Sequence, residues 1–411
     1  MSLKNILVAL AAMGATALAS PAKTKRAAAY DDNPFDGVAM YVNPYYRDEI
    51  HELALPQMTG SLAEKAKLVA EVPSFQWLDK IAKIDLMAST LAEIREANNA
   101  GADPPYAGLF VIYNFPDRDC SAKASDGELH LSENGLERYR TEYIDAIAEL
   151  VKEYDDIRTI FVYGSSSFSI AAPPGAPLPL DQPKCLGAAD AYHQSTVYAM
   201  KTLNFDNVAL YVDGGHAGWL GWPGNLNTTA EVFGTAFKEA GKPRSVRGVA
   251  TNVSNYNAYN VTEPPVYTDP NPNWDESRFH EALAPFLEEH EFPAHFIVDT
   301  GRSGVQPAGR ESWSNWCNIK ETGFGIRPSA DTPTELLDAF VWVKPGGESD
   351  GTSDETAERY DTMCSSNSSV IPAPEAGDWF QEYFEMLIEN ANPPFKVACK
   401  NKKAKRSAKL F

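Results

Sequence analysis

Residues 111–120 read VIYNFPDRDC, and they place a buried strand directly before a cluster of reactive side chains. The apolar run LFVIYN at 109–114 is typical of a strand buried within a sheet. Two aspartates, an arginine and a cysteine follow within 117–120. Such polar chemistry at the end of a buried strand indicates an enzyme site.

Strand and helix patterns alternate along the chain on both sides of this stretch. Runs rich in Val, Ile, Phe and Tyr recur at 37–42, 109–114, 159–163, 207–212, 246–251, 295–299 and 339–343. Between them, apolar residues return every three to four positions, most clearly at 86–98, 134–154, 188–203, 229–240, 275–290 and 378–390. This alternation predicts a mostly parallel sheet of seven strands that closes as an α/β barrel.

Polar segments follow six of the predicted strands. They read PDRDC, GSSS, DGGHAGW, TNVSNYN, DTGRSG and KPGGESDGTSD. Any one of them could be an ordinary turn. Because the loops at the carboxyl ends of barrel strands build the active site, six such segments on one rim predict a functional face.

The composition is that of a globular, acidic protein. Of its 411 residues, 44% are hydrophobic and 22% charged, and the formal net charge is −20. Nucleic acid and anionic membranes are poor partners for such a surface, whereas a neutral substrate is compatible with it.

The amino terminus has the pattern of a secretory signal peptide over residues 1–19. Lys4 precedes an apolar run at 6–18, which is too short to span a membrane and ends in a small-residue cleavage pattern. A dibasic pair closes residues 20–26, a predicted pro-segment whose alternative is an unprocessed basic spacer. Removing residues 1–26 would change the net charge to −24. We therefore expect a secreted, extracellular protein.

The remainder is predicted to be one domain over 27–395 with a basic tail over 396–411. No Ser, Thr or Pro-rich linker and no small cysteine-rich region suggests an appended binding module. Cys399 lies in the tail, either as an unpaired thiol in a disordered segment or as an intermolecular tether. Asn-x-Ser/Thr sequons begin at Asn227, Asn252, Asn260 and Asn367. Glycosylation is expected at those that are exposed.

The stretch 111–120 resembles the first signature of glycoside hydrolase family 6, Val-x-Tyr-x-x-Pro-x-Arg-Asp-Cys. Similar segments extend from about Phe75 to Phe395: VPSFQWLD, YVDGGHAGWLGWPGN, GVATNVSNYN, TGRSGVQPAGR, WCN, TGFGIRPSA and KPGGESDGTSD. The family contains inverting cellobiohydrolases and endoglucanases. The resemblance implies a distorted seven-stranded parallel β/α barrel with an active-site tunnel, which as a monomer binds β-1,4-glucan or cello-oligosaccharide without a cofactor. No His, Cys and Asp grouping has metal-ligand spacing, so no metal is expected.

Five cysteines in a secreted chain suggest two bridges and one leftover, and arithmetic alone allows fifteen such arrangements. The resemblance selects Cys120–Cys185 and Cys317–Cys364, leaving Cys399.

The resemblance also assigns the substrate contacts. Tryptophans would stack on successive glucose rings, although any one alone could be core packing: Trp77, Trp219, Trp222 and Trp316. Their hydrogen-bonding partners along the glucan would be Asp79, Ser125, His216, Asn255, Lys344 and Glu348. A lone histidine such as His216 would more often be structural.

Inversion needs one carboxylic acid to protonate the leaving oxygen and a second carboxylate to assist the attacking water. By the resemblance, Asp119 tunes the acid and takes part in the water relay, and Tyr113 helps to distort the sugar. Arg118 would keep Asp119 ionised. Asp213 would lie near the acid. Asp350 would act as base or charge stabiliser, with a salt bridge to Lys344 as the plain alternative.

The sequence departs from the family after the predicted strand 159–163. Family members carry Glu-Pro-Asp-Ser there, with the aspartate as general acid, but this chain has Gly164, Ser165, Ser166 and Ser167. Ser166 therefore occupies the acid position. No acidic residue occurs between Asp156 and Asp181, and Asp181 lies in a proline-rich insertion.

These observations favour a secreted cellobiohydrolase-like protein that binds a glucan in a tunnel, with hydrolysis reduced or lost at Ser166. The alternative is an active inverting β-1,4-glucanase or cellobiohydrolase that uses Asp119 as acid through a water. A surface interaction protein that has lost sugar binding is a third possibility, which the retained tryptophans disfavour.

Overall fold

The computed structural model describes residues 28–120, 124–164, 183–306 and 309–397. The predicted signal peptide and pro-segment, Ser166, Asp181 and Cys399 lie outside these described residues.

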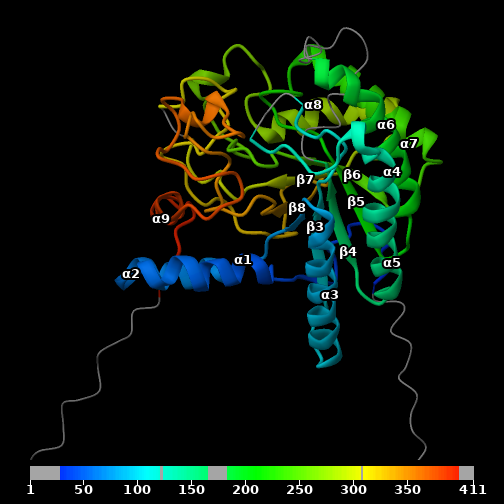
Figure 1. Ribbon diagram of the computed structural model, residues 1–411, viewed down its shortest axis with the longest axis horizontal. Helices are drawn as coiled ribbons and strands as arrows, with labels where there is room; N and C mark the ends of the chain where they lie inside the picture. Colours follow the sequence, from blue (N-terminus) through cyan, green and yellow to red (C-terminus); the bar gives the residue numbers. More distant parts are fainter. Residues whose placement is uncertain (1–27, 121–123, 165–182, 307–308, 398–411) are drawn as a thin grey trace, which may run out of the picture.

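Parallel strands form the centre of the molecule (Figure 1). The order of the curled sheet is β1-β3-β4-β5-β6-β7-β8, and β2 pairs with β3 beside β1. The strands are β1 (Ala39–Met40), β2 (Gln76–Leu78), β3 (Tyr106–Ile112), β4 (Thr159–Tyr163), β5 (Val208–Asp213), β6 (Val246–Thr251), β7 (Phe296–Asp299) and β8 (Leu337–Val341). The prediction of a distorted parallel β/α barrel is confirmed.

The barrel is not closed by a continuous hydrogen-bond ladder in the described part of the chain. Strands β1 and β2 share one edge of β3: β1 pairs with its start at Tyr106 and Ala107, and β2 with its end. Past the end of β8, the Phe75 amide donates to the Trp342 carbonyl over 2.9 Å. The Trp77 indole donates to the Val343 carbonyl over 2.8 Å. We call this sparse contact between β2 and the end of β8 the seam.

Helices alternate with the strands as the apolar periodicity predicts. They are α3 (Ile84–Asn99), α4 (Gly135–Arg138), α5 (Asp145–Glu153), α6 (Pro183–Thr202), α7 (Pro223–Glu239), α8 (Glu276–Glu289) and α9 (Gln381–Glu389). Figure 1 shows α4 to α7 along one side of the strands, and α1 (Pro44–Glu49), α2 (Gly60–Ala70) and α9 on the other.

Side chains alternate between two apolar cores on the sheet. In β3, Leu109 and Val111 join the cluster inside the barrel, whereas Phe110 and Ile112 join the cluster under the outer helices. Because successive side chains of a strand point to opposite faces, a continuous apolar run serves both cores. A third cluster joins α1, α2 and α9. Tyr113, the residue after β3, completes the inner core at the rim.

Candidate active site

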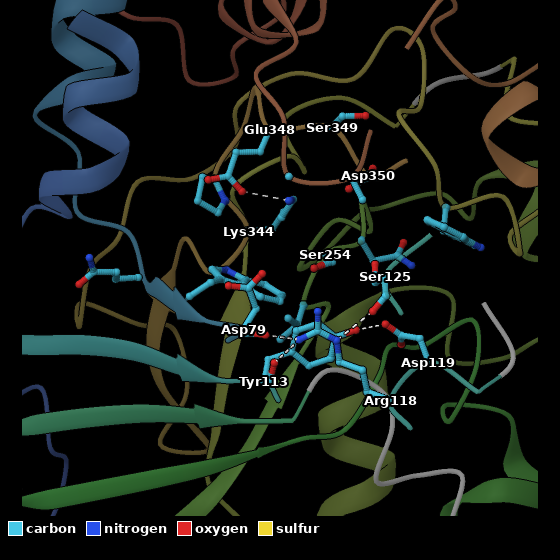
Figure 2. A pocket seen from close by; sticks show the side chains of 18 of the residues that line it. Asp79, Tyr113, Arg118, Asp119, Ser125, Ser254, Lys344, Glu348, Ser349 and Asp350 are labelled. Carbon is cyan, nitrogen blue, oxygen red and sulfur yellow. Dashed lines mark hydrogen bonds and ion pairs between the residues drawn. The ribbon is translucent and has the colours of Figure 1, made fainter. Parts of the chain in front are cut away.

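A cavity of about 320 Å³ lies at the carboxyl ends of the strands, where the polar segments were predicted to converge. It gathers most of the predicted site residues: Trp77, Asp79, Tyr113, Arg118, Asp119, Ser125, His216, Trp219, Asn255, Trp316, Lys344, Glu348 and Asp350. Figure 2 shows several of these side chains facing one space from the turn after β3 and from the segment after β8. The convergence of distant segments supports the prediction of a functional rim.

Three tryptophans line the cavity, and each is only half-buried. Trp77 comes from β2, Trp219 from the loop after β5, and Trp316 precedes Cys317. The Trp77 ring meets the Tyr113 ring edge-on with centroids 5.4 Å apart. Half-buried indoles in a cavity offer flat apolar faces to a ligand while their positions stay fixed by packing.

The turn after β3 is built around Arg118. Its guanidinium donates to the carbonyls of Asp79 (2.7 Å), Tyr113 (2.5 Å) and Ser125 (2.9 Å), and it lies 4.4 Å above the Tyr113 ring. A Cβ on Gly127 would lie 2.9 Å from the Arg118 Nε atom, so only glycine fits there. Arg118 therefore organises the loops around Asp119.

Asp119 is presented by a strained backbone. Asp117 and Asp119 have φ angles of 49° and 50°, in the left-handed region that Asp and Asn tolerate best after Gly. The Tyr113 hydroxyl donates to the Asp119 Oδ2 atom (Figure 2). Burial, followed by the Asp119 charge, raises the pKa of Tyr113 well above its usual value. The phenol therefore stays protonated and remains a donor to Asp119.

Asp350 forms a buried ion pair with Arg302, so the alternative of a Lys344 salt bridge is wrong. The exposed fractions of the Arg302 and Asp350 side chains are 1% and 5%, and Arg302 Nη1 lies 2.8 Å from both carboxylate oxygens. Oδ2 also accepts from the Tyr256 hydroxyl (2.5 Å) and the Asn318 amide (2.9 Å). Burial alone would lower the pKa of Arg302, but coulombic attraction to Asp350 raises it well above its usual value, so the guanidinium stays charged beside the Asp350 carboxyl group.

Lys344 pairs instead with Glu348, four residues on, over 3.1 Å. Burial, then repulsion from Glu348, raise the pKa of Glu49 to about 9, and Glu49 hydrogen-bonds to Glu348. At the same end of the cavity Asp79 pairs with Lys83 over 2.7 Å. Burial alone would raise the pKa of Asp79, but Lys83 and Arg118 lower it. This end of the cavity thus offers the paired Lys344, Glu348, Asp79 and Lys83 side chains to sugar hydroxyls, whereas Glu49 does not itself line the cavity.

Of the predicted site residues that the structure describes, two do not line the cavity. Asp213 is buried at the end of β5, where Oδ1 accepts from the Gly215 amide over 2.8 Å. Trp222 is the residue before α7, and its indole donates to the Gly218 carbonyl over 2.9 Å. In this structure both residues support the loop after β5.

The comparisons with known proteins agree with this geometry. Residues 35–391 match the family described as Glycosyl hydrolases family 6. The chain belongs to this family. It is 54% identical over 369 residues to the 1,4-beta-D-glucan cellobiohydrolase CEL6A of Podospora anserina, covering 90% of this chain and 75% of the relative. It is 53% identical over 377 residues to Exoglucanase-6A of Humicola insolens, covering 91% and 78%.

Solved structures of the family share this fold. The catalytic core domain of cellobiohydrolase Cel6A from Chaetomium thermophilum is similar with a TM-score of 0.86 and 55% identity, covering 89% of this chain and all of that one. Cellobiohydrolase II (Cel6A) from Humicola insolens, in complex with glucose and cellotetraose, gives 0.85 and 54%, covering 88% and 100%.

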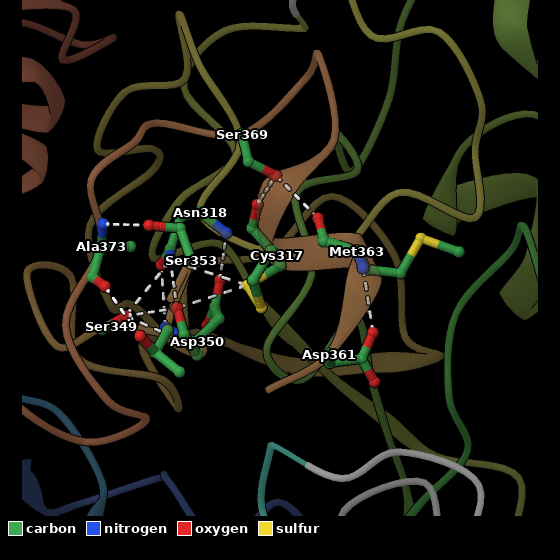
Figure 3. The surroundings of a disulfide bond; sticks show 12 residues. Cys317, Asn318, Ser349, Asp350, Ser353, Asp361, Met363, Ser369 and Ala373 are labelled. Atoms are coloured by element: carbon green, nitrogen blue, oxygen red, sulfur yellow. Dashed lines mark hydrogen bonds between the residues drawn. A yellow bond between two sulfur atoms is a disulfide. The ribbon is translucent and has the colours of Figure 1, made fainter. Parts of the chain in front are cut away.

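Both family-implied disulfides are present, and one supports the site. Cys120 bonds to Cys185, and Cys317 to Cys364. Figure 3 shows Asn318, next to Cys317, close to Ser349 and Asp350. The Asn318 side chain accepts from the Asp350 amide over 2.8 Å and donates to Ser349 Oγ over 3.2 Å. The second bridge therefore anchors the segment that holds Asp350.

Some lining residues of this family 6 site escaped the sequence analysis. Arg359 lines the cavity, forms a 3.0 Å ion pair with Glu375 and contacts the Ala124 carbonyl at 3.4 Å. Tyr45, which belongs to α1, lines another part of the cavity. Neither residue lies in a motif of the family resemblance, and a lone tyrosine or arginine outside those motifs carries no other signal in the sequence.

Two further observations concern only the described residues. Among them, no group of three or more His, Cys, Asp or Glu could hold a metal ion. None of the helices described is both long and apolar enough to cross a membrane.

The Asn252 sequon is unusable in the folded chain, because that side chain is fully buried and donates to the Asn257 and Asp299 carbonyls. Asn227, Asn260 and Asn367 are exposed.

Proposed function

We propose that this chain is an inverting β-1,4-glucan hydrolase of the cellobiohydrolase type, with Asp119 supplying the proton through a water. The observation that carries the proposal is one cavity lined both by three half-buried tryptophans and by Asp119 and Asp350. Relatives that are half identical or more bear the names cellobiohydrolase and exoglucanase, and one holds cellotetraose.

Substrate binding would combine stacking with hydrogen bonding. Trp77, Trp219 and Trp316 offer apolar faces to successive glucose rings, while the polar lining groups meet the hydroxyls. A glucan is neutral, so the high negative charge of the chain does not oppose its approach.

The two carboxyl groups suit different tasks. In an inverting reaction, a water oxygen bonds to the anomeric carbon as the glycosidic bond breaks; the leaving oxygen takes a proton from the acid, and the attacking water gives up one proton, which returns through neighbouring water to the ionised acid. Asp119 accepts a hydrogen bond from Tyr113 and faces the cavity, so it can exchange a proton with a water there. Asp350 has its oxygens occupied by Arg302, Tyr256 and Asn318, which suits a carboxylate that stabilises positive charge on the sugar.

A second candidate function is glucan binding with weak hydrolysis. It is favoured by the serine at position 166, where the family has its general acid. A Cβ on Gly164 would lie 3.8 Å from the Asp213 Cβ atom, so Gly164 itself lies beside the buried end of β5. An absent general acid would slow hydrolysis by roughly 10²–10⁴-fold.

Hydrolysis and binding of cellohexaose separate the two candidates. If the chain is an active hydrolase, wild-type protein releases shorter oligosaccharides, and Ser166→Asp raises the rate of hydrolysis less than about tenfold. If the chain mainly binds glucan, calorimetry detects binding by wild type, and Ser166→Asp raises the rate of hydrolysis by about 10² or more. Absence of both binding and turnover would refute the whole glucan assignment.

The biological setting is also a proposal. The leader-like residues 1–26 and two disulfides support secretion to an oxidising environment. We propose that the mature chain acts there as a monomer on cellulose.

A further inference from the structure

The loop after β5 carries His216 and Trp219 into the cavity, and buried polar side chains from other segments hold it in place. The Glu276 Oε1 atom, at the start of α8, accepts from the Ala217 amide over 3.0 Å. The Asn271 side chain donates to the Ala217 carbonyl over 3.0 Å. Glu276 and Asn271 are both buried. Neither residue lines the cavity, so their contribution to the site must pass through the loop.

Asn257 connects Glu276 to His216. Its Nδ2 group lies 2.8 Å from Glu276 Oε1 and 3.3 Å from His216 Nδ1. Its Oδ1 atom accepts from the Trp313 indole over 2.7 Å. Because an indole N–H can only donate, it fixes the carbonyl end of the Asn257 side chain, and the amide hydrogens must then face Glu276 and His216.

His216 Nδ1 therefore faces two donors. The Gly218 amide donates to it over 3.1 Å, and Asn257 supplies the second N–H. A nitrogen that accepts hydrogen bonds carries no proton, so the single proton of a neutral imidazole must sit on Nε2. Burial, then the positive charge of Arg310, lower the pKa of His216 to about 3, which keeps the ring neutral.

We propose that Asn257 and Glu276 are positioning residues that lock His216 in its neutral Nε2–H tautomer, as a hydrogen-bond donor to a glucan hydroxyl. The ligand in this inference rests on the proposed function, whereas the tautomer is a property of the free protein. The locked ring offers its Nε2–H to the cavity without reorganisation when the sugar arrives.

The tautomer can be read by ¹⁵N NMR of histidine-labelled protein, with the His216 signals identified by their loss in His216→Gln. Wild type should show a single Nε2–H tautomer that does not titrate between pH 4 and 8. A protonated Nδ1, a mixture of tautomers, or a titration near the ordinary histidine value would overturn the proposal, whatever any variant does.

Asn257→Asp is the matched perturbation, because it keeps the shape and the acceptor for Trp313 but turns an oxygen toward His216. We expect the single proton of the neutral His216 ring to move from Nε2 to Nδ1, and cellotetraose affinity to fall about 3- to 10-fold, the effect of one lost hydrogen bond. Asn99→Asp, exposed at the end of α3, adds the same charge and should change neither. An unchanged His216 spectrum in folded Asn257→Asp protein would refute the positioning role. If wild type binds no cello-oligosaccharide, the proposed function fails, while the spectra still decide the tautomer.

Discussion

Asp119→Asn is the substitution that tests the proposed chemistry most directly. It removes the only proton that Asp119 could deliver while leaving an oxygen to accept from Tyr113. If Asp119 is the acid, turnover of cellohexaose should fall by about 10²–10⁴-fold, which corresponds to about 3–5 kcal/mol of activation free energy.

The structure indicates that this variant will fold and bind. Residue 119 has a φ of 50°, a left-handed conformation that asparagine adopts at least as readily as aspartate. The loops around it are held by Arg118 through backbone carbonyls, which the change does not touch. Cellohexaose affinity should therefore stay within about tenfold of wild type, the most that loss of one neutral hydrogen bond would cost.

The assay is the initial rate on cellohexaose and on 2,4-dinitrophenyl β-cellobioside, combined with calorimetric binding. The dinitrophenolate departs without protonation, so loss of an acid should slow this substrate much less than cellohexaose. Asp117→Asn is the matched control, since Asp117 shares the turn but does not line the cavity. An Asp119→Asn enzyme that turns over cellohexaose at the wild-type rate would refute the role of Asp119. An equal loss on both substrates would show that Asp119 does not act as the acid.

Three further predictions follow from the contacts described above. Trp316→Ala should weaken cellohexaose binding about tenfold, or about 1.4 kcal/mol, through loss of a stacking face, and an unchanged calorimetric Kd would contradict its placement in the glucan site. The double substitution Cys317→Ala and Cys364→Ala should lower the free energy of unfolding, measured by denaturant titration, by at most about 4 kcal/mol for a 47-residue separation. It should also reduce the turnover rate, because Asn318 would no longer be held against Asp350. Undiminished turnover would show that the bridge does not support the site. Burial raises the pKa of Glu276 from 4.5 to about 7, so the free energy of unfolding should fall by up to about 3 kcal/mol as the pH rises from 4.5 toward 7. Glu276→Gln should reduce this pH dependence in thermal unfolding curves, and an unchanged pH dependence would contradict the raised pKa.

The main strands and outer helices could be predicted from the sequence because both depend on local apolar patterning. β2 was missed because its three residues, QWL, are too few to show a period. It pairs with β3 more than 30 residues on, and Trp77 also contacts Val343, 266 residues away in the chain, so neither neighbour could be read from local pattern. α1 and α2 were also missed, since their apolar faces pack against α9 from the far end of the chain.

The residues of the site could be predicted where they lie in a family motif, but the partner of a charged or aromatic side chain could not be predicted where several partners were available. Lys344 pairs with Glu348, which a local turn of the chain brings to it, whereas Asp350 pairs with Arg302 from 48 residues upstream. Trp222 lies in a matched motif, yet it lies at the amino terminus of α7 with its indole bonded to the backbone. Such choices depend on the route of the chain in three dimensions.

The seam gives the barrel a mechanical property that a closed ring would lack. A fully laddered ring resists opening equally all round, but here the described residues at the gap are joined by isolated hydrogen bonds to the Trp342 and Val343 carbonyls. Trp77 and Lys344 lie on opposite sides of this gap, and both line the cavity. A glucan in contact with both would act as a brace across the weakest part of the ring, so occupancy and rigidity would rise together. The stiffness of the scaffold would then be set partly by its ligand, and an empty barrel would be the more compliant one.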